Sequence, residues 1–389
     1  MTTIPSNFQS PKSSRLVFVD LLRGWAVLVM IETHVFNALS LPDFKAAGWF
    51  DILNFVNGLV APSFLFVSGF VFQLSAGRKI DELRTFGPAF RKQLGRMLVI
   101  WLVAYGLHLP FFSFRRIVAG TTADGWLGFF QSDILHCIVV GWLFLLFSIV
   151  FIRSEILYRW WLILTSLVIV FITPVIWETD FLPHVPAPVA AYLNGQHYSL
   201  FPIFPWMAFM VSGSVTASLY LAAMAKGTQQ DFIKRISAVG FILILVSFLL
   251  ALVPFRVEGL STSWRANPLF FFLRLGIVFL LLRACWYYAE RRRTEQSFVL
   301  DVSRESFLVY VVHLLILYGR YIDDKNVVDI YGGSFTPLEC LLGSLGLAAV
   351  MVALSKFWGF LKRRSFVVAR TVSYAVAMVT IVLFFVRKY

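Results

Sequence analysis

The chain has 389 residues, of which 59% are hydrophobic and only 14% are charged, and its formal net charge is +13. Soluble domains average about 25% charged residues, and a chain of this size cannot bury so much apolar surface in water. The composition therefore excludes a soluble enzyme, a disordered protein and a nucleic-acid binder with a free basic face. It indicates a polytopic membrane protein.

Apolar segments follow one another along almost the whole chain. Residues 1–14 are polar and rich in Pro and Ser, so we expect a disordered cytoplasmic tail, and we expect 15–389 to form a single transmembrane domain. A span needs about 20 mostly apolar residues, and barrel strands would show an alternating pattern that is missing here. We therefore predict an all-α transmembrane bundle of about eleven spans. In chain order they are 16–39, 52–75, 95–113, 134–152, 159–177, 201–222, 237–254, 268–289, 300–319, 337–356 and 367–386.

The basic residues predict the orientation of this bundle. With the N-terminus in the cytoplasm, the inner loops and helix ends carry 21 Lys and Arg residues and the outer ones carry 9. Positive charge collects on the cytoplasmic side of membrane proteins. We therefore expect an integral protein of a bacterial inner membrane with a cytoplasmic N-terminus. Most of the net charge then serves topology and contact with anionic lipids, and no nucleic-acid partner is expected.

The first span contains ionisable residues that are costly in lipid and are therefore candidates for function. Arg23 and His34 are eleven residues apart, which places them on one helix face about 16–17 Å apart along the axis. Asp20 precedes Arg23 by three residues and can pair with it. Glu32 lies roughly opposite this face. A structural ion pair with a hydrogen-bonded histidine would give the same pattern without any catalytic role.

These residues carry a resemblance to a known superfamily. The first span, RLVFVDLLRGWAVLVMIETH, resembles the first helix of transmembrane acyltransferases, which include the acyltransferase-3 proteins and the heparan-α-glucosaminide N-acetyltransferase-like proteins. Later segments are similar as well: NGLVAPSFLFVSGFVF, RKQLGRMLVIW, QSDILHCIVVGWL, SLFPIFPWMAFMVSG and SFLVYVVHLLILY. Acyltransferase-3 proteins carry Arg and His separated by ten residues, which Arg23 and His34 match. The animal heparan enzymes place a histidine in the loop after the first helix, and the corresponding loop here, 40–51, contains none.

The resemblance implies transfer of an acetyl or other acyl group from acetyl-CoA to a sugar or glycan at the outer face. Arg23, held by Asp20, has a planar guanidinium suited to the phosphates of the donor, and Arg91 and Arg96 add charge on the cytoplasmic side. His34 is then the base for the acceptor hydroxyl or amine, or the carrier of the acyl group. Direct transfer and an acyl-histidine intermediate both stay open at this point.

Further polar residues fall in the outer half of the predicted bundle. Asp133 and His136 can share a helix face, either as a second catalytic pair or as an ordinary helix cap. His313, Arg274 and Trp206 are candidates for contact with the acceptor. The alternatives, core packing for His313 and an interfacial position for Trp206, are favoured over that contact, whereas an ion pair explains Arg274 equally well. No group of His, Cys and carboxylate residues has metal-ligand spacing, so no metal is expected.

Two other classes of protein remain open. A secondary transporter or flippase could use the path formed by Asp20, Arg23 and His34, although matching broken helices in two halves of the chain are not visible. A silent membrane scaffold gives no reason for charges inside a span. The acceptor, O- against N-acylation, the acyl chain length and whether the chain forms a homo-oligomer are left open by the sequence.

Overall fold

The described part of the chain is built from helices and their connecting loops. The computed structural model describes residues 15–253, 261–292, 297–320 and 325–387, and the predicted tail 1–14 lies outside them. Within the described ranges there are helices and one isolated β-bridge but no strand, which confirms the predicted all-α class. The chain divides into two compact units, which are described separately below.

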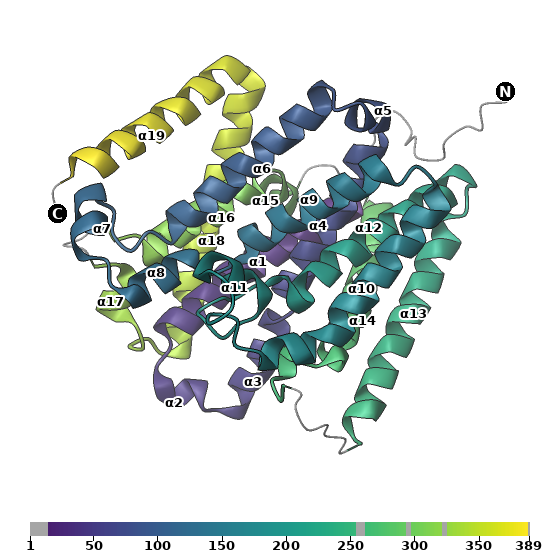
Figure 1. Cartoon of the computed structure of the whole chain (residues 1–389), viewed down its shortest axis with the longest axis horizontal. Helices are drawn as coiled ribbons and strands as arrows, with labels where there is room; N and C mark the ends of the chain where they lie inside the picture. The colour runs from purple at the N-terminus through teal and green to yellow at the C-terminus, as the bar shows by residue number, and fades with distance from the viewer. Residues whose placement is uncertain (1–14, 254–260, 293–296, 321–324, 388–389) are drawn as a thin grey trace. The chain divides into compact units, whose positions relative to one another are not determined.

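The first unit, called here the α1 unit, contains residues 17–60, 109–129 and 288–389. Its helices are α1 (Val17–Leu39), α2 (Pro42–Lys45), α3 (Gly48–Asn57), α7 (Phe114–Gly120), most of α8 (Ala123–Phe130), α15 (Phe298–Arg304), α16 (Ser306–Tyr318), α17 (Val327–Tyr331), α18 (Pro337–Arg364) and α19 (Phe366–Val386). Helix α1 packs against α15, α16 and α18 (Figure 1). Because a Cβ at Gly24 would collide with the carbonyl of Val299, the glycine lets α15 lie directly on α1.

The second unit, called here the α9 unit, contains residues 61–108 and 130–287 together with the described part of 1–16. Its helices are α4 (Val60–Gly77), α5 (Ile80–Arg84), α6 (Pro88–Leu107), α9 (Ile134–Phe151), α10 (Glu155–Glu178), α11 (Ala187–Leu193), α12 (Ile203–Ala225), α13 (Gln229–Ala251), the short 3₁₀ helix η1 (Trp264–Ala266) and most of α14 (Pro268–Arg292). Helix α12 is central and contacts α9, α10, α11 and α13. Gly69 of α4 faces the backbone of Met210, so α4 and α12 pack at short range.

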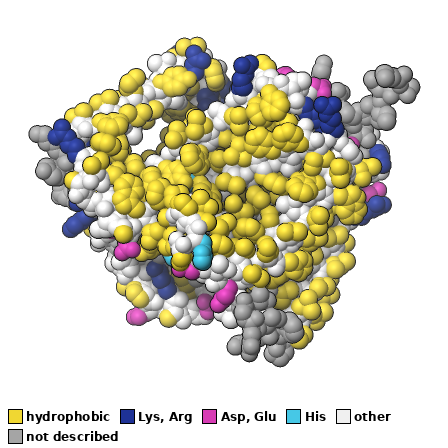
Figure 2. All heavy atoms as spheres, in the orientation of Figure 1, with side chains coloured by type: hydrophobic (Ala, Val, Ile, Leu, Met, Phe, Trp, Pro, Cys, Tyr) yellow, Lys and Arg dark blue, Asp and Glu magenta, His cyan; other side chains and the backbone are white. Residues whose placement is uncertain are grey.

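Eight helical segments among the described residues are long and apolar enough to cross a membrane. They are Gly48–Gly77, Ile134–Phe151, Glu155–Glu178, Ile203–Ala225, Gln229–Ala251, Pro268–Arg292, Pro337–Arg364 and Phe366–Val386. Helix α13 exposes bulky apolar side chains such as Phe241 and Phe248, and Figure 2 shows hydrophobic side chains covering the surface over this helix. A surface of this kind suits contact with lipid. The predicted number of spans and the orientation of the N-terminus stay predictions.

Helix boundaries differ from the sequence-based prediction in three places. The predicted span 300–319 is two helices, α15 and α16, because Glu305 between them leaves the helical conformation; its carboxylate accepts from Lys362 at 2.6 Å. The predicted span 52–75 is likewise two helices, α3 and α4. The predicted span 95–113 begins earlier and ends at Leu107, three residues before Pro110, which cannot continue the helical hydrogen-bond pattern.

Candidate functional site

The start of α1 carries an anchored arginine. Arg23 Nη2 lies 2.7 Å from Asp20 Oδ1, which confirms the predicted pair, and Arg23 Nε donates to Ser303 Oγ at 2.9 Å. The side chains of Arg23 and Asp20 keep 21% and 17% of their surface exposed, so this end of the helix is reachable from outside the unit. Ser303 comes from α15, and sequence reasoning missed it because 280 residues separate it from Arg23.

Three turns further along α1, His34 meets a second histidine. The ring centroids of His34 and His313 are 5.3 Å apart, and the Tyr318 hydroxyl lies 3.4 Å from His34 Nδ1. His313 is fully buried, and its Nδ1 lies 2.7 Å from the carbonyl oxygen of Val309. Because a carbonyl only accepts, His313 carries its proton on Nδ1 and presents a lone pair at Nε2. Two residues that the sequence singled out separately are thus neighbours.

Both ends of α1 are completed by one helix pair. Ser303 of α15 contacts Arg23, whereas His313 and Tyr318 of α16 contact His34. Glu305 lies between α15 and α16, and its carboxylate accepts a hydrogen bond from Lys362 of α18. Since α1 is continuous from Val17 to Leu39, the rise from arginine to histidine is about 16–17 Å. This unit therefore places Arg23 and His34 on one continuous helix, and α16 adds His313 beside His34.

The α9 unit contains a separate cluster at the start of α9. Asp133 is the N-cap of this helix, and its Oδ1 accepts from the backbone N–H of His136 at 3.0 Å. The same oxygen lies 2.8 Å from His136 Nδ1, so the carboxylate also orients the imidazole. His108, directly after α6, places Nε2 at 3.4 Å from Asp133 Oδ2. The predicted pair of Asp133 and His136 is confirmed as a contact, and His108 joins it from a distant part of the sequence.

Aromatic residues pack around His136 in this cluster. The ring of Tyr105 meets His136 edge to face at 4.4 Å between centroids, and Tyr192 packs against the same imidazole at 5.9 Å. Trp101 Nε1 donates to the Tyr192 hydroxyl at 3.0 Å. Burial raises the pKa of the Tyr192 phenol, which therefore stays protonated at physiological pH. Asp133 and His136 are 3% and 0% exposed, so their contact acts in a dry environment.

The same three side chains could hold a metal ion. One ligand atom each of His108, Asp133 and His136 lies within 4.8 Å of the others. Two imidazoles and a carboxylate are a ligand set that zinc and similar ions accept. Sequence spacing does not predict this group, because His108 lies 25 residues before Asp133 and outside any short metal-binding motif.

The remaining predicted site residues lie in the α9 unit. Arg91 and Arg96 are exposed on α6. Arg274 is buried in α14, with its guanidinium 4.6 Å from the ring centroid of Phe270. Trp206 is also buried and packs edge to face on Phe270, at a centroid distance of 5.5 Å. Arg274 and Trp206 thus share one aromatic neighbour, and their proposed contact with an acceptor stays a prediction.

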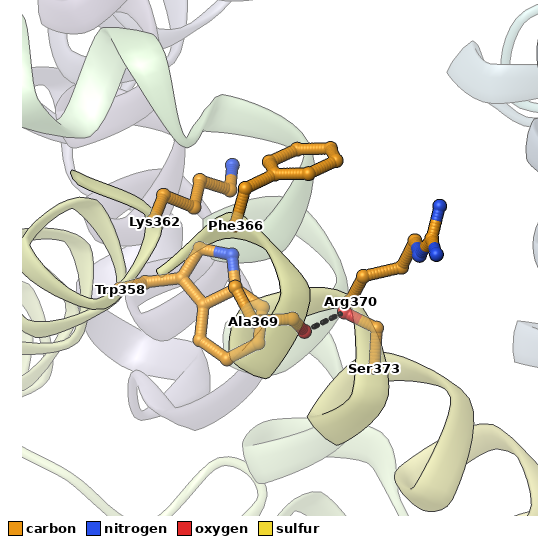
Figure 3. Close-up of a pocket in the computed structure, with 6 residues that line it drawn as sticks. All are labelled: Trp358, Lys362, Phe366, Ala369, Arg370 and Ser373. Carbon is orange, nitrogen blue, oxygen red and sulfur yellow. Dashed lines mark hydrogen bonds between the residues drawn. The ribbon is translucent and has the colours of Figure 1, made fainter. Parts of the chain in front are cut away.

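A shallow recess of about 150 Å³ lies between α18 and α19 (Figure 3). It is lined by Trp358, Lys362, Phe366, Ala369, Arg370 and Ser373. None of the site residues predicted from the sequence lines this recess. Its combination of a tryptophan with two cations beside long apolar helices is typical of contact with lipid head groups.

Comparison with known families decides the class of the protein. Residues 15–250 match the family described as heparan-alpha-glucosaminide N-acetyltransferase, catalytic. The chain belongs to this family. The match includes Asp20, Arg23 and His34 of α1 and the Asp133–His136 pair of α9. A search of curated proteins finds no match to the chain.

The family is one of acetyltransferases, and the apolar helices of the chain fit an integral membrane protein. Ser303, His313 and Tyr318 lie beyond the matched residues, although they contact the matched helix α1. The part of the chain after residue 250 therefore completes both polar ends of α1.

Proposed function

We propose that this chain is an integral-membrane acetyltransferase of a bacterial inner membrane. It moves an acetyl group from cytoplasmic acetyl-CoA to the amine or hydroxyl of a sugar at the outer face. The observation that carries the proposal is α1, where the family match coincides with an anchored arginine and, three turns further on, a histidine pair. The glucosaminide named in the family description is the acceptor class to test first.

The donor is proposed to bind at the arginine end of α1. Arg23 is held in place by Asp20 and Ser303, so its guanidinium meets phosphate oxygens with little loss of side-chain entropy. The exposed Arg91 and Arg96 of α6 add positive potential that attracts the anionic donor. The extended pantetheine arm of the donor is comparable in length with the rise from Arg23 to His34, so the thioester reaches the histidine.

Acetyl transfer is proposed to occur beside His34. As the acceptor nitrogen or oxygen attacks the thioester carbonyl, His34 takes its proton, the carbon–sulfur bond breaks and CoA leaves as the thiolate that recovers a proton. If His34 itself attacks first, the acetyl group rests on the imidazole and then passes to the acceptor. His313, whose Nε2 presents a lone pair, is proposed to contact the acceptor beside His34.

Asp133 and His136 are proposed as a second catalytic pair. His136 Nδ1 lies 2.8 Å from the Asp133 carboxylate and 3.3 Å from the backbone nitrogen of Asp133; in the tautomer that donates to the carboxylate, Nε2 is the atom that accepts a proton. Arg274 and Trp206, which meet at Phe270, are proposed to contact the acceptor from α14 and α12. Membrane lipids are proposed as further partners.

The experiment that tests the proposal uses the purified chain in detergent with acetyl-CoA and glucosamine. We expect release of the CoA thiol that depends on the acceptor, with one acetylated sugar formed for each thiol released. The competing transporter or flippase would instead carry the sugar into liposomes without any donor. Uptake without acetyl-CoA, together with no thiol release, would contradict the proposal.

A further inference from the structure

We infer that His108, Asp133 and His136 form a binding site for a divalent transition-metal ion of the zinc type. The three residues come from the end of α6 and the beginning of α9, and one ligand atom of each lies within 4.8 Å of the other two. The site lies within the α9 unit, and its existence does not depend on the proposed acetyl transfer.

The geometry of the cluster suits such an ion. Zinc stands about 2.0–2.1 Å from imidazole nitrogen and about 2.0–2.2 Å from carboxylate oxygen, with tetrahedral angles. Two such ligands are then roughly 3.3–3.5 Å apart. His108 Nε2 and Asp133 Oδ2 are 3.4 Å apart, which is the separation of two ligands on one ion and long for a hydrogen bond. His136 is the third ligand, with a ring nitrogen within 4.8 Å of the ligand atoms of the other two residues.

The carboxylate of Asp133 can bind an ion without giving up the cap of α9. Its Oδ1 accepts from the backbone N–H of His136 at 3.0 Å, whereas Oδ2 faces His108. The two oxygens therefore have separate tasks. A carboxylate shared in this way between a helix cap and a metal is held in orientation before the ion arrives.

The nitrogen atoms of the cluster supply a second, independent observation. Within the described residues, His108 Nε2 and His136 Nε2 are buried atoms without a hydrogen-bond partner. His136 is 0% exposed, so bulk solvent does not reach its ring. Buried polar atoms in folded proteins nearly always have partners, and an ion that binds imidazole nitrogen is one way to supply one.

One consequence rests on the proposed function. A metal ion on His136 takes the lone pair that the proposed base needs, so zinc is expected to slow acetyl transfer. His108 has no part in the proposed transfer. A His108→Gln variant is therefore expected to transfer acetyl groups in the absence of zinc and to be at least 10-fold less sensitive to added zinc.

Metal binding itself is the decisive experiment, measured without any substrate. The purified chain is titrated with Zn²⁺, and with Co²⁺ as a spectroscopic probe whose visible bands report coordination. We expect one ion per wild-type chain and at least a 10-fold loss of affinity in His108→Gln. The matched control is His197→Gln. His197 also lies close to a carboxylate, 3.0 Å from Asp180, but among the described residues this pair belongs to no group of three possible metal ligands.

Two results overturn the inference. One is a wild-type chain that binds no ion at 100-fold molar excess of Zn²⁺, and the other is equal affinity in wild type and His108→Gln. The Asp133→Asn variant guards against misfolding as an explanation, since asparagine also caps helices while its amide is a poor zinc ligand. An inactive chain that binds zinc would contradict the proposed function and leave the metal site standing.

Discussion

The histidine pair of the α1 unit and the histidine cluster of the α9 unit differ in the groups that contact their imidazoles. His34 and His313 touch a tyrosine hydroxyl and a backbone carbonyl. Within the described residues, no carboxylate lies at ion-pair distance from either of them. His136, in contrast, has the Asp133 carboxylate 2.8 Å from its Nδ1, with His108 on the other oxygen.

This difference separates two kinds of chemistry. An imidazole without a nearby carboxylate gains little from becoming charged, so its lone pair stays available as a nucleophile or as a transient base. An imidazole beside a buried carboxylate is held in one orientation, and the same pair also suits a metal ion. We therefore propose His34 as the residue that transfers the acetyl group and regard Asp133 and His136 as a second pair that the carboxylate orients.

The largest expected effect is that of His34→Ala. Loss of the proposed base or acetyl carrier should lower kcat by about 10²–10⁴-fold, the usual contribution of a positioned acid–base group. The measurement is release of CoA thiol by purified protein, with His184→Ala as the control, because His184 is exposed in the loop after α10. Equal rates for His34→Ala and the control would move the chemistry away from α1.

Arg23→Gln tests the donor end of the same helix. A charge-assisted hydrogen bond to phosphate contributes about 1.5–3 kcal/mol, so KM for acetyl-CoA should rise by about 10–100-fold while KM for the sugar is unchanged. Ser303→Ala removes only one support of the guanidinium and should raise the same KM by less. If the KM for the sugar rises instead, the arginine end binds the acceptor and our assignment of the two ends is reversed.

His313→Asn asks how far the second imidazole of the α1 unit takes part. We expect about a 10-fold loss in kcat/KM for the sugar, the equivalent of one hydrogen bond, with little change in KM for acetyl-CoA. Asparagine keeps a polar group at this buried position, which limits the loss of stability. An unchanged kcat/KM would make His313 a packing residue and leave His34 to act alone.

Asp133 separates the structural and chemical tasks of the α9 cluster. Asp133→Ala removes the cap of α9 and should lower the free energy of unfolding by about 1 kcal/mol, whereas Asp133→Asn keeps the cap and should lie close to wild type. Both variants remove the charge that orients His136, so both should slow acetyl transfer. Thermal unfolding in detergent, measured beside thiol release, gives both quantities; transfer at the wild-type rate in Asp133→Asn would leave Asp133 as a cap only.

The smallest effect concerns an exposed pair of the same two residue types. The hydrogen bond from His197 lowers the pKa of the Asp180 carboxyl. A carboxyl whose pKa is lower in the folded state stabilises the fold above its unfolded value of about 3.9, and this contribution disappears as the pH falls through the folded value. The Tm difference between wild type and His197→Ala should therefore be small near neutral pH and shrink further below about pH 4. A difference that grows on acidification would contradict the pairing.

The features that the sequence predicts correctly are mostly local ones. The Asp20–Arg23 and Asp133–His136 contacts join residues three apart on one helix or its cap, and such pairs follow from helix geometry alone. The all-α class follows from apolar segments that lipid forces into helices. The break at Glu305 does not follow from the local sequence, and the contact of Glu305 with Lys362 joins residues 57 apart.

Contacts between distant segments could not be read from spacing. Ser303 reaches Arg23 only because Gly24 allows α15 to lie close to α1. His108 lies close to Asp133 because α6, which ends at Leu107, packs against α9. Both residues are of ordinary types in apolar surroundings, and neither belongs to a motif that would mark it.

The most direct test of the account places the two substrates on opposite sides of a membrane. Liposomes containing the chain are loaded with glucosamine, labelled acetyl-CoA is added outside, and labelled N-acetylglucosamine is measured inside. Vesicles hold the chain in both orientations, and those with the arginine end of α1 outward are expected to form labelled product. His34→Ala should reduce this product by at least 100-fold. Product formed equally by His34→Ala, or no product from wild type under conditions where it binds acetyl-CoA, would contradict the account.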